Sequence, residues 1–257
     1  MRDLERYLRE SRLAGDVATP RESNLRHAKA FAAGDEYYLF GLTPRGDWSY
    51  EDVVALMAER AGIDPDLTRT TGADTIDPAL TAAALERLRA RVARAAADRE
   101  PVLLASGHPD GVIEIHFVLA RALRGAGCPV LTPGEGARFT VNPSYADPTG
   151  ERWIRYVDSV ATAADERRSR HSHSPGGMEL MLTELTERPG LVVADHGFAG
   201  AAAAAGLDVV SFADCNDPGL FVGEAEGQVA VTVPIDDNVD PHLYAPVSEF
   251  LLAGWAA

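Results

Sequence analysis

The sequence has few cysteines and no long apolar run. Cys128 and Cys215 are the two cysteines in 257 residues. They are too few for a disulfide framework, so we expect both thiols to be reduced. No apolar run approaches the roughly 20 residues that a membrane-spanning helix needs, and residues 1–10 mix acidic and basic side chains without an apolar signal region. We therefore expect a cytoplasmic protein.

Positive charge is also scarce. The chain has 24 Lys and Arg residues against 39 Asp and Glu residues, which gives a net charge of −15. Such a field repels phosphate backbones and anionic lipid, so we expect neither nucleic acid nor a membrane as a partner. Lys29 is the single lysine, so arginine, the better bidentate phosphate ligand, supplies almost all local cations for an anionic substrate.

Hydrophobic residues make up 46% of the chain, enough for a substantial core. From residue 101 onward, apolar runs alternate with segments of helical period, which indicates right-handed crossovers in a mostly parallel sheet. We predict a single α/β domain over residues 1–257. Residues 101–257 are expected to form a three-layer, Rossmann-like sheet core, and residues 1–100 a mainly helical N-terminal cap.

The expected elements follow from this pattern. Strands are predicted at 37–41, 102–106, 129–132, 153–158, 191–194, 208–213 and 228–233. Helices are predicted at 1–14, 24–33, 50–61, 111–125, 177–186, 198–205 and 244–253, with a polar turn at 16–24. A further helix is expected to start at Asp77-Pro78, an N-cap followed by proline at the first helical position.

Polar residues follow three of the apolar runs directly. The runs are 102–105, 191–194 and 209–213, and most of the histidines lie close to such run ends. Buried parallel strands read as continuous apolar runs, and ligands collect beyond their carboxyl ends. The sequence therefore predicts an enzyme whose active site lies at this edge of the sheet.

The first of these turns predicts an anion site. It consists of Ser106, Gly107, His108, Pro109, Asp110 and Gly111. A helix is expected directly after it, so backbone N–H groups and the positive end of the helix dipole favour an anion there. We expect Ser106, Gly107 and Gly111 to bind phosphate. His108 or Asp110 would act as general acid or base, unless both only cap the helix.

Carboxylates follow the other two runs. Asp195 and His196 come after 191–194, and Asp214, Asn216 and Asp217 come after 209–213. Neighbouring carboxylates repel one another unless a cation or hydrogen bonds relieve them, and hard divalent cations prefer oxygen ligands. We predict a divalent metal ion, Mg, Mn or similar, whose expected ligands are Asp195, Asp214, Asn216 and Asp217. Asp217 is also a catalytic candidate. A helix N-cap for Asp195 and an ordinary turn at 214–218 remain alternatives.

Two more segments are candidates for phosphate binding. His171, His173 and Ser174 follow a basic cluster and precede a helix, which we interpret either as a mobile loop closing over a phosphate or as a solvated loop. The cap offers a second set of polar groups: Arg21, Asn24 and His27. Residues 236–238 end the last strand, where an interaction with His242 is conceivable.

Six motifs carry a family resemblance. They lie at 17–22, 106–109, 171–175, 193–197, 213–218 and 236–239 and span nearly the full length. Through them the chain resembles a family of actinobacterial proteins named simply phosphatase, which implies hydrolysis of a phosphate ester. The order of a helical part, then strand, polar turn and helix also loosely resembles the metal-dependent damage-control phosphatases. Their Asp-Asn pair at the first strand end is absent here.

A competing resemblance gives a second hypothesis. The segment 105–111, a helix and then 128–131 look like the start of the zinc-dependent sugar deacetylases with a His-Pro-Asp-Asp-Glu motif. That resemblance implies His108 as a zinc ligand and Asp110 as general base. The second aspartate of the motif, itself a ligand, is replaced by Gly111, a serious loss for a three-ligand zinc site.

We therefore predict a metal-dependent phosphatase that hydrolyses a small phosphomonoester, a nucleoside or sugar phosphate, with secondary metabolism as a candidate setting. Phosphoryl transfer needs mainly positioning and charge neutralisation, which these oxygens, imidazoles and arginines provide. The alternatives are a zinc-dependent deacetylase of sugar-like substrates and a noncatalytic binder of phosphorylated metabolites. The expected partner is a small phosphorylated metabolite, and a homodimer is left open.

Overall fold

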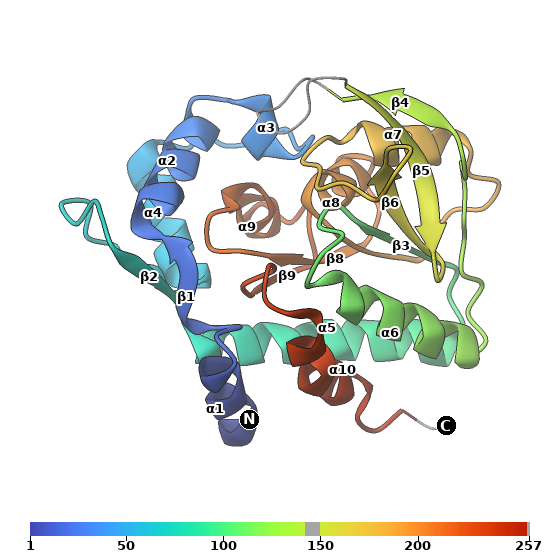
Figure 1. Cartoon of the computed structure of the whole chain (residues 1–257), viewed down its shortest axis with the longest axis horizontal. Coiled ribbons are helices and arrows are strands. Elements are labelled where there is room, and N and C mark those ends of the chain that lie inside the picture. Colours follow the sequence, from blue (N-terminus) through green and yellow to red (C-terminus); the bar gives the residue numbers. More distant parts are fainter. Residues whose placement is uncertain (142–149, 256–257) are drawn as a thin grey trace.

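A computed structural model describes residues 1–141 and 150–255. Within these residues the centre is a seven-stranded sheet in the order β4-β5-β6-β3-β7-β8-β9 (Figure 1). The parallel part consists of β6 (Val160–Ala164), β3 (Val102–Ser106), β7 (Leu191–Asp195), β8 (Val209–Ala213) and β9 (Val231–Pro234). β4 (Arg138–Thr140) and β5 (Glu151–Val157) extend it in antiparallel fashion beyond β6.

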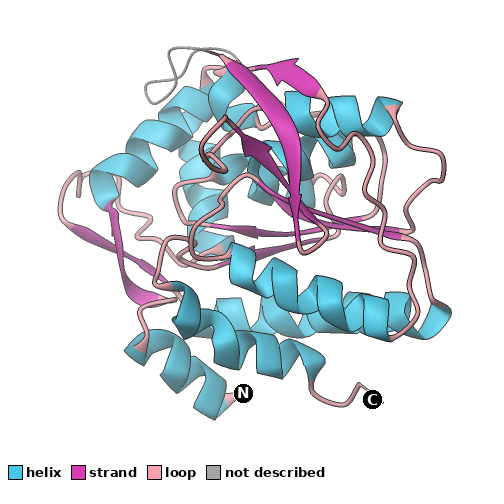
Figure 2. Ribbon diagram, turned by 45° about the vertical axis from the view of Figure 1, so that its right-hand side comes forward, coloured by secondary structure: helices cyan, strands magenta, loops and turns pink. Residues whose placement is uncertain are grey.

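Helices cover both faces of this sheet, which confirms the predicted three-layer, Rossmann-like α/β fold (Figures 1 and 2). One face carries α5 (Pro78–Asp98), α6 (Ile113–Gly125) and α10 (Ala245–Leu252), preceded by the 3-10 turn η1 (Pro241–Tyr244). The other face carries α7 (Gly176–Thr183), α8 (His196–Ala204) and α9 (Pro218–Ala225). The side chain of Asp77 caps α5 with Pro78 at its start, as predicted. No helix in the described part of the chain is long and apolar enough to cross a membrane.

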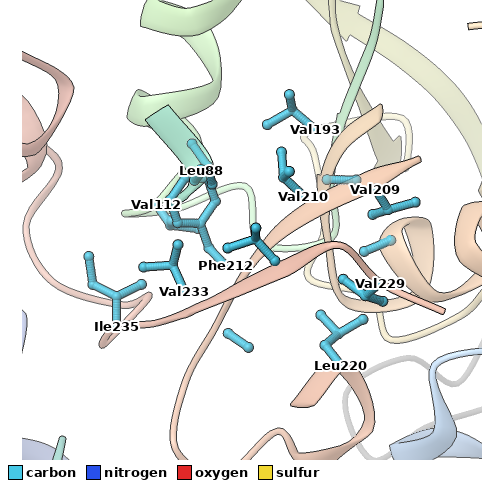
Figure 3. Packing of buried hydrophobic residues seen from close by; sticks show 14 of the residues in the cluster. Leu88, Val112, Val193, Val209, Val210, Phe212, Leu220, Val229, Val233 and Ile235 are labelled. Carbon is cyan, nitrogen blue, oxygen red and sulfur yellow. The ribbon is translucent and has the colours of Figure 1, made fainter. Parts of the chain in front are cut away.

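The core explains why the central strands read as continuous apolar runs. Every residue of β3, β6, β7 and β8 is buried, because helices cover both faces. Figure 3 shows side chains of the sheet, such as Phe212 and Val233, beside Leu88 of α5 and Val112 before α6. The sheet is thereby fixed as a platform for the loops at its strand ends.

The residues before α5, which we call the cap, are only partly helical, whereas α5 itself, predicted as part of the cap, covers one face of the sheet (Figure 1). The cap comprises α1 (Arg2–Glu10), β1 (Gly15–Pro20), α2 (Arg21–Ala32), α3 (Glu36–Leu39), α4 (Tyr50–Arg60) and β2 (Ala73–Ile76). β1 and β2 pair antiparallel in a separate two-stranded sheet. The cap joins the core beyond β9, where Asp236 N donates to Leu13 O at 2.9 Å and Ala18 N donates to Asp236 Oδ2 at 3.3 Å.

Several predicted elements need correction. The strand expected at 37–41 is the helix α3, because the side chain of Asp35 accepts a hydrogen bond from Tyr37 N and caps it. The polar turn at 16–24 is β1 and the start of α2, and the strand at 129–132 is reduced to a bridge between Val130 and Val102. Helix α9 and strands β2, β4 and β6 were not predicted. Residues 142–149, between the strands predicted at 129–132 and 153–158, lie outside the described residues.

The strand order creates a crevice at one edge of the sheet. From β3 the chain continues to β6 on one side, whereas β7, β8 and β9 follow on the other side. The direction of strand order thus reverses between β3 and β7, and the connecting helices on either side cover opposite faces of the sheet. The carboxyl ends of β3 and β7 therefore lie at a topological switch point. Ser106 ends β3 and Asp195 ends β7, and both begin motifs predicted to form the active site.

Candidate functional site

A pocket of about 580 Å³ lies at the switch point, within the usual size range for small-molecule sites. The cap, the loop before α7 and the loops after β3, β8 and β9 contribute its walls. The lining residues are Thr19, Arg26, His27, Tyr37, Tyr38, His108, His171, His173, His196, Asp214, Asn216, Asp217, Asp237 and Asn238. Most of the seven histidines of the chain thus face one cavity.

Asp195 organises the turn after β3. Its Oδ1 accepts hydrogen bonds from Gly107 N at 2.6 Å, His108 N at 3.2 Å and His196 Nδ1 at 3.0 Å. Its Oδ2 accepts one from Ser106 Oγ at 2.6 Å. Asp195 occupies the N-cap position of α8 but makes no capping bond with its side chain. Both oxygens therefore orient the chain around the pocket, which gives Ser106 and Gly107 a structural task beside their predicted phosphate role.

His196 is held in an unusual backbone conformation. Its φ is 45°, in the left-handed region that a residue with a Cβ rarely adopts. Glycines allow the loops to close around it: a Cβ on Gly107 would lie 2.8 Å from the Cβ of His196, and one on Gly197 would lie 2.3 Å from His173 O. These close approaches press the loop 171–175 against the end of β7.

Four histidines and two aspartates gather at the floor of the pocket. Two groups have ligand atoms that all lie within 4.8 Å of one another: His108, His171 and His196, and His173, His196 and Asp217. His196 belongs to both, and its Nε2 lies 3.4 Å from Asp217 Oδ2 and 3.4 Å from His171 Nε2. We call these residues, together with Asp237, the His-Asp cluster.

Asp237 and His196 are the two members of this cluster to which the sequence analysis assigned no role. Asp237 Oδ2 lies 3.4 Å from His108 Nδ1 and 3.6 Å from His196 Nε2. Gly111 lies at φ 64°, and a Cβ there would lie 2.4 Å from Asp237 O. Gly111 thus lets the segment after β9 approach the turn after β3. The Asp236-Asp237-Asn238 motif was the available signal, but one sequence does not show which loop it faces.

Carboxylates crowd this end of the sheet. Asp195, Asp214, Asp217, Asp236 and Asp237 are all buried. Burial, and then the negative charges of Asp237 and Asp236, raise the pKa of Asp214 well above its ordinary value. Asp214 Oδ2 accepts a short hydrogen bond from Thr19 Oγ1, and Oδ1 accepts one from Cys215 N at 2.6 Å.

The histidines differ in their protonation. Burial opposes charge on His196, but its contacts with Asp195 and Asp217 outweigh burial and raise its pKa well above the ordinary value. Desolvation, and then the charges of neighbouring histidines, lower the pKa of His171 to about 3 and the pKa of His173 well below its ordinary value. Neutral imidazoles are the form that binds metal ions.

The structure corrects the predicted source of positive charge from the cap. Arg21 is fully buried, with Nη1 3.0 Å from Asp74 Oδ2, and Asn24 Nδ2 donates to the same oxygen at 2.9 Å. Both residues hold α2 in place and neither lines the pocket. Arg26, one turn further along α2, is exposed and lines it. His27 lines the pocket as well, and its Nδ1 donates to Asn216 O at 2.8 Å.

Two other predicted residues lie apart from the pocket wall. Asp110 is exposed and is not among the described lining residues, because Gly111 turns the chain directly toward α6. Ser174 Oγ accepts a hydrogen bond from Gly176 N at 3.2 Å and so shapes the entry to α7. An exposed Asp110 and a glycine at 111 leave the deacetylase hypothesis without its base and its second carboxylate ligand.

The His-Asp cluster fits a metal ion on observations independent of the sequence motifs. His108 Nδ1 is buried and makes no hydrogen bond. Asp217 occupies the N-cap position of α9, yet its side chain makes no capping bond. A buried nitrogen without a hydrogen-bond partner, among imidazoles and carboxylates that lie 3.4–3.6 Å apart, is what a cation site offers. His196 Nδ1 donates to Asp195, the carboxylate-histidine arrangement common behind metal ligands.

Comparison with known proteins gives two matches. A family model described as Phosphatase matches residues 1–256. The protein named Phosphatase SCO2771, from Streptomyces coelicolor, is 43% identical over 256 residues, which cover 97% of this chain and 94% of that relative. No solved structure matches the chain.

Proposed function

The chain belongs to the Phosphatase family, as its motifs predict, and from this premise we propose that it hydrolyses a small phosphomonoester in a metal-dependent reaction. The observation that carries this proposal is the His-Asp cluster at the switch point of the sheet. Carboxylates and imidazoles that converge in a pocket of metabolite size support hydrolysis over simple binding.

We assign the metal to a ligand set that differs from the one predicted from sequence. Asp217 is retained, while His108, His171, His173, His196 and Asp237 replace Asp195, Asp214 and Asn216. Asp195 hydrogen-bonds to the ligand His196 instead. Imidazole-rich sites suit Zn, Fe, Co, Ni or Mn better than Mg, which prefers oxygen alone. When bound, the ion supplies charge neutralisation for the phosphoryl group and a water of lowered pKa.

The residues of the chain provide the other parts of the reaction. Arg26 lines the pocket from α2 and can pair with phosphate oxygens by a bidentate contact. Asp214 also lines the pocket, and burial together with the neighbouring carboxylates raises its pKa, which favours a proton on its carboxyl group. We place the proton for the leaving oxygen there, in the role that the sequence analysis gave to His108 or Asp110.

The experiment is phosphate release from metal-stripped protein with single metal ions added back. The substrate panel contains nucleoside monophosphates and sugar phosphates. We expect release from a subset of substrates with Zn, Mn, Fe, Co or Ni, and a loss of about 100-fold or more in Asp217→Asn and His173→Ala. Asp110→Asn is the matched control, because Asp110 is another predicted site aspartate that is exposed and is not among the pocket-lining residues. Absence of release with every metal would refute the proposal.

A noncatalytic binder is separated from an enzyme by the same variants. An enzyme loses turnover in Asp217→Asn, whereas a binder that needs no metal keeps its affinity for the phosphorylated compound. Calorimetric titration of each variant with adenosine 5′-monophosphate distinguishes these two results.

A further inference from the structure

The outer part of the pocket carries two adjacent tyrosines from α3. Tyr37 and Tyr38 both line the cavity, and we call them the aromatic wall. Tyr37 is 38% exposed, one of few large hydrophobic side chains with such exposure among the described residues. An exposed aromatic ring in a pocket is a common feature of ligand-binding surfaces.

The wall is held rigidly against the core. A Cβ on Gly219 would lie 2.7 Å from Tyr38 O, and one on Gly200 would lie 2.1 Å from Phe40 O. The backbone of α3 and of Phe40, which follows it, therefore lies directly against α9 and α8. Because a preformed surface loses little conformational entropy on binding, this packing favours a role in recognition.

The two rings have a fixed geometry relative to the His-Asp cluster. Tyr37 stacks on His173 with ring centroids 4.0 Å apart and an interplanar angle of 15°, and the edge of Tyr38 meets Tyr37 at 80°. Tyr37 O also accepts a hydrogen bond from His173 Nδ1 at 3.2 Å. The wall thus begins in direct contact with one proposed metal ligand, His173, and Tyr37 is partly exposed to solvent.

We propose that the aromatic wall binds a planar ring in the alcohol part of the substrate. This inference rests on the proposed function and narrows its substrate class to phosphomonoesters that carry a flat ring, such as nucleoside monophosphates. Aromatic side chains stack on the π face of a flat ring whatever its identity, and a sugar has no such face. Arg26 and the His-Asp cluster then take the phosphate end of the same molecule.

The test compares two substrates that differ by one ring system. Adenosine 5′-monophosphate and ribose 5-phosphate share the ribose and the phosphate. In Tyr37→Leu we expect the ratio of their kcat/KM values to fall about tenfold, within the range of base-stacking contributions, chiefly through a higher KM for the nucleotide. Tyr37→Phe keeps the ring and should restore the ratio. Tyr50→Leu is the matched control, because Tyr50 begins α4 and is not among the described pocket residues.

Two further measurements keep the outcomes distinct. Metal content of Tyr37→Leu is measured first, and loss of metal would show that the ring only supports His173, which overturns the proposal. An equal decrease for both substrates would also overturn it while leaving the phosphatase intact. If neither substrate is hydrolysed, calorimetric binding of the same pair decides: weaker binding of the nucleotide alone supports the wall, and equal binding of both contradicts it.

Discussion

Both carboxylate oxygens of Asp195 accept hydrogen bonds from the protein itself. We therefore interpret Asp195 as a residue that orients its neighbours, not as one that binds metal or substrate. Its partners are two backbone N–H groups, Ser106 Oγ and His196 Nδ1. Its second oxygen also lies 3.4 Å from Nε2 of the fully buried His116. A carboxylate in this position fixes which nitrogen of His196 faces the pocket.

Replacement of Asp195 should therefore weaken metal binding without removing a ligand. For Asp195→Asn we expect metal affinity to fall about 10- to 100-fold, as is usual for residues that orient a ligand, because the amide cannot accept all of these bonds. Competition with a chelator measures the affinity. Unchanged affinity together with unchanged activity would show that His196 keeps its orientation without Asp195.

For Asp110 we expect the opposite result, no effect on the reaction. Because it is exposed and outside the described pocket wall, Asp110→Asn should keep phosphate release within about twofold, as substitutions at such surface positions usually do. A loss of 100-fold or more would restore its predicted role as general base and favour the deacetylase-like arrangement.

The sequence predicted the loops of the site better than the roles of their residues. His108, His173 and Asp217 were singled out and do line one pocket. Arg21 and Arg26 show the limit: they lie on the same helix, yet Arg21 points into a buried pair with Asp74 and Arg26 faces the cavity. Which side of a helix meets the core depends on the packing of the cap, and that information is not local in the sequence.

At the scale of elements, the strands of the core could be predicted from local sequence, whereas the short helices depend on tertiary packing. Strands β3, β7 and β8 were predicted within one residue at each end because complete burial leaves continuous apolar runs. Helices α3 and α9 are short: Asp35 caps α3, and Gly219 lets α9 approach Tyr38 O of α3 closely. In α9, Asp217-Pro218 starts a helix, although the same residues also form turns.

Glycine contacts between elements should be sensitive to a single methyl group. Gly200→Ala would place its Cβ 2.1 Å from Phe40 O, whereas Gly125→Ala, in α6, would meet nothing within 4 Å. We expect the first to lower the free energy of unfolding by about 1–3 kcal/mol and the second to leave it unchanged or raise it by up to about 1 kcal/mol. Urea unfolding measures both, and equal stability of the two variants would contradict this packing.

The loop before α4 should respond to pH through Glu226. Its carboxylate accepts hydrogen bonds from Arg45 N, Gly46 N and Trp48 Nε1 at 2.8–2.9 Å. Burial opposes the charged form, but these hydrogen bonds outweigh it and lower the pKa of Glu226. A lowered pKa in the folded state means that the stabilisation is complete above the unfolded value of about 4.3 and is lost as pH falls through the folded value.

Glu226→Gln should therefore destabilise the protein by about 1 kcal/mol at pH 7, a value reduced for exposure to solvent. The difference from the wild type should shrink below about pH 4. Urea unfolding across this range measures it, with the exposed Glu187→Gln as control. A difference that does not vary with pH would mean that the carboxylate charge contributes nothing to this loop.

For the whole molecule, metal binding should be visible as stability. A ligand that binds only the folded state at 100 times its dissociation constant adds about 2.7 kcal/mol, which raises Tm by about 5–10 °C for a chain of this size. Thermal unfolding with and without a chelator measures the shift. Asp217→Asn, which lacks one proposed ligand, should show a much smaller shift, and an equal shift in both proteins would place the ion elsewhere.

The pocket is lined by residues from Thr19 to Asn238, nearly the whole length of the chain. During synthesis the ribosome therefore releases the cap, β3 and β7 long before Asp237 leaves the exit tunnel. Residues that are this far apart in sequence meet late in folding, since loop closure between them comes at an entropic cost. A nascent chain without Asp237 can expose single histidines but not the complete cluster, so the proposed metal site forms only once the segment after β9 has folded against the loops before it.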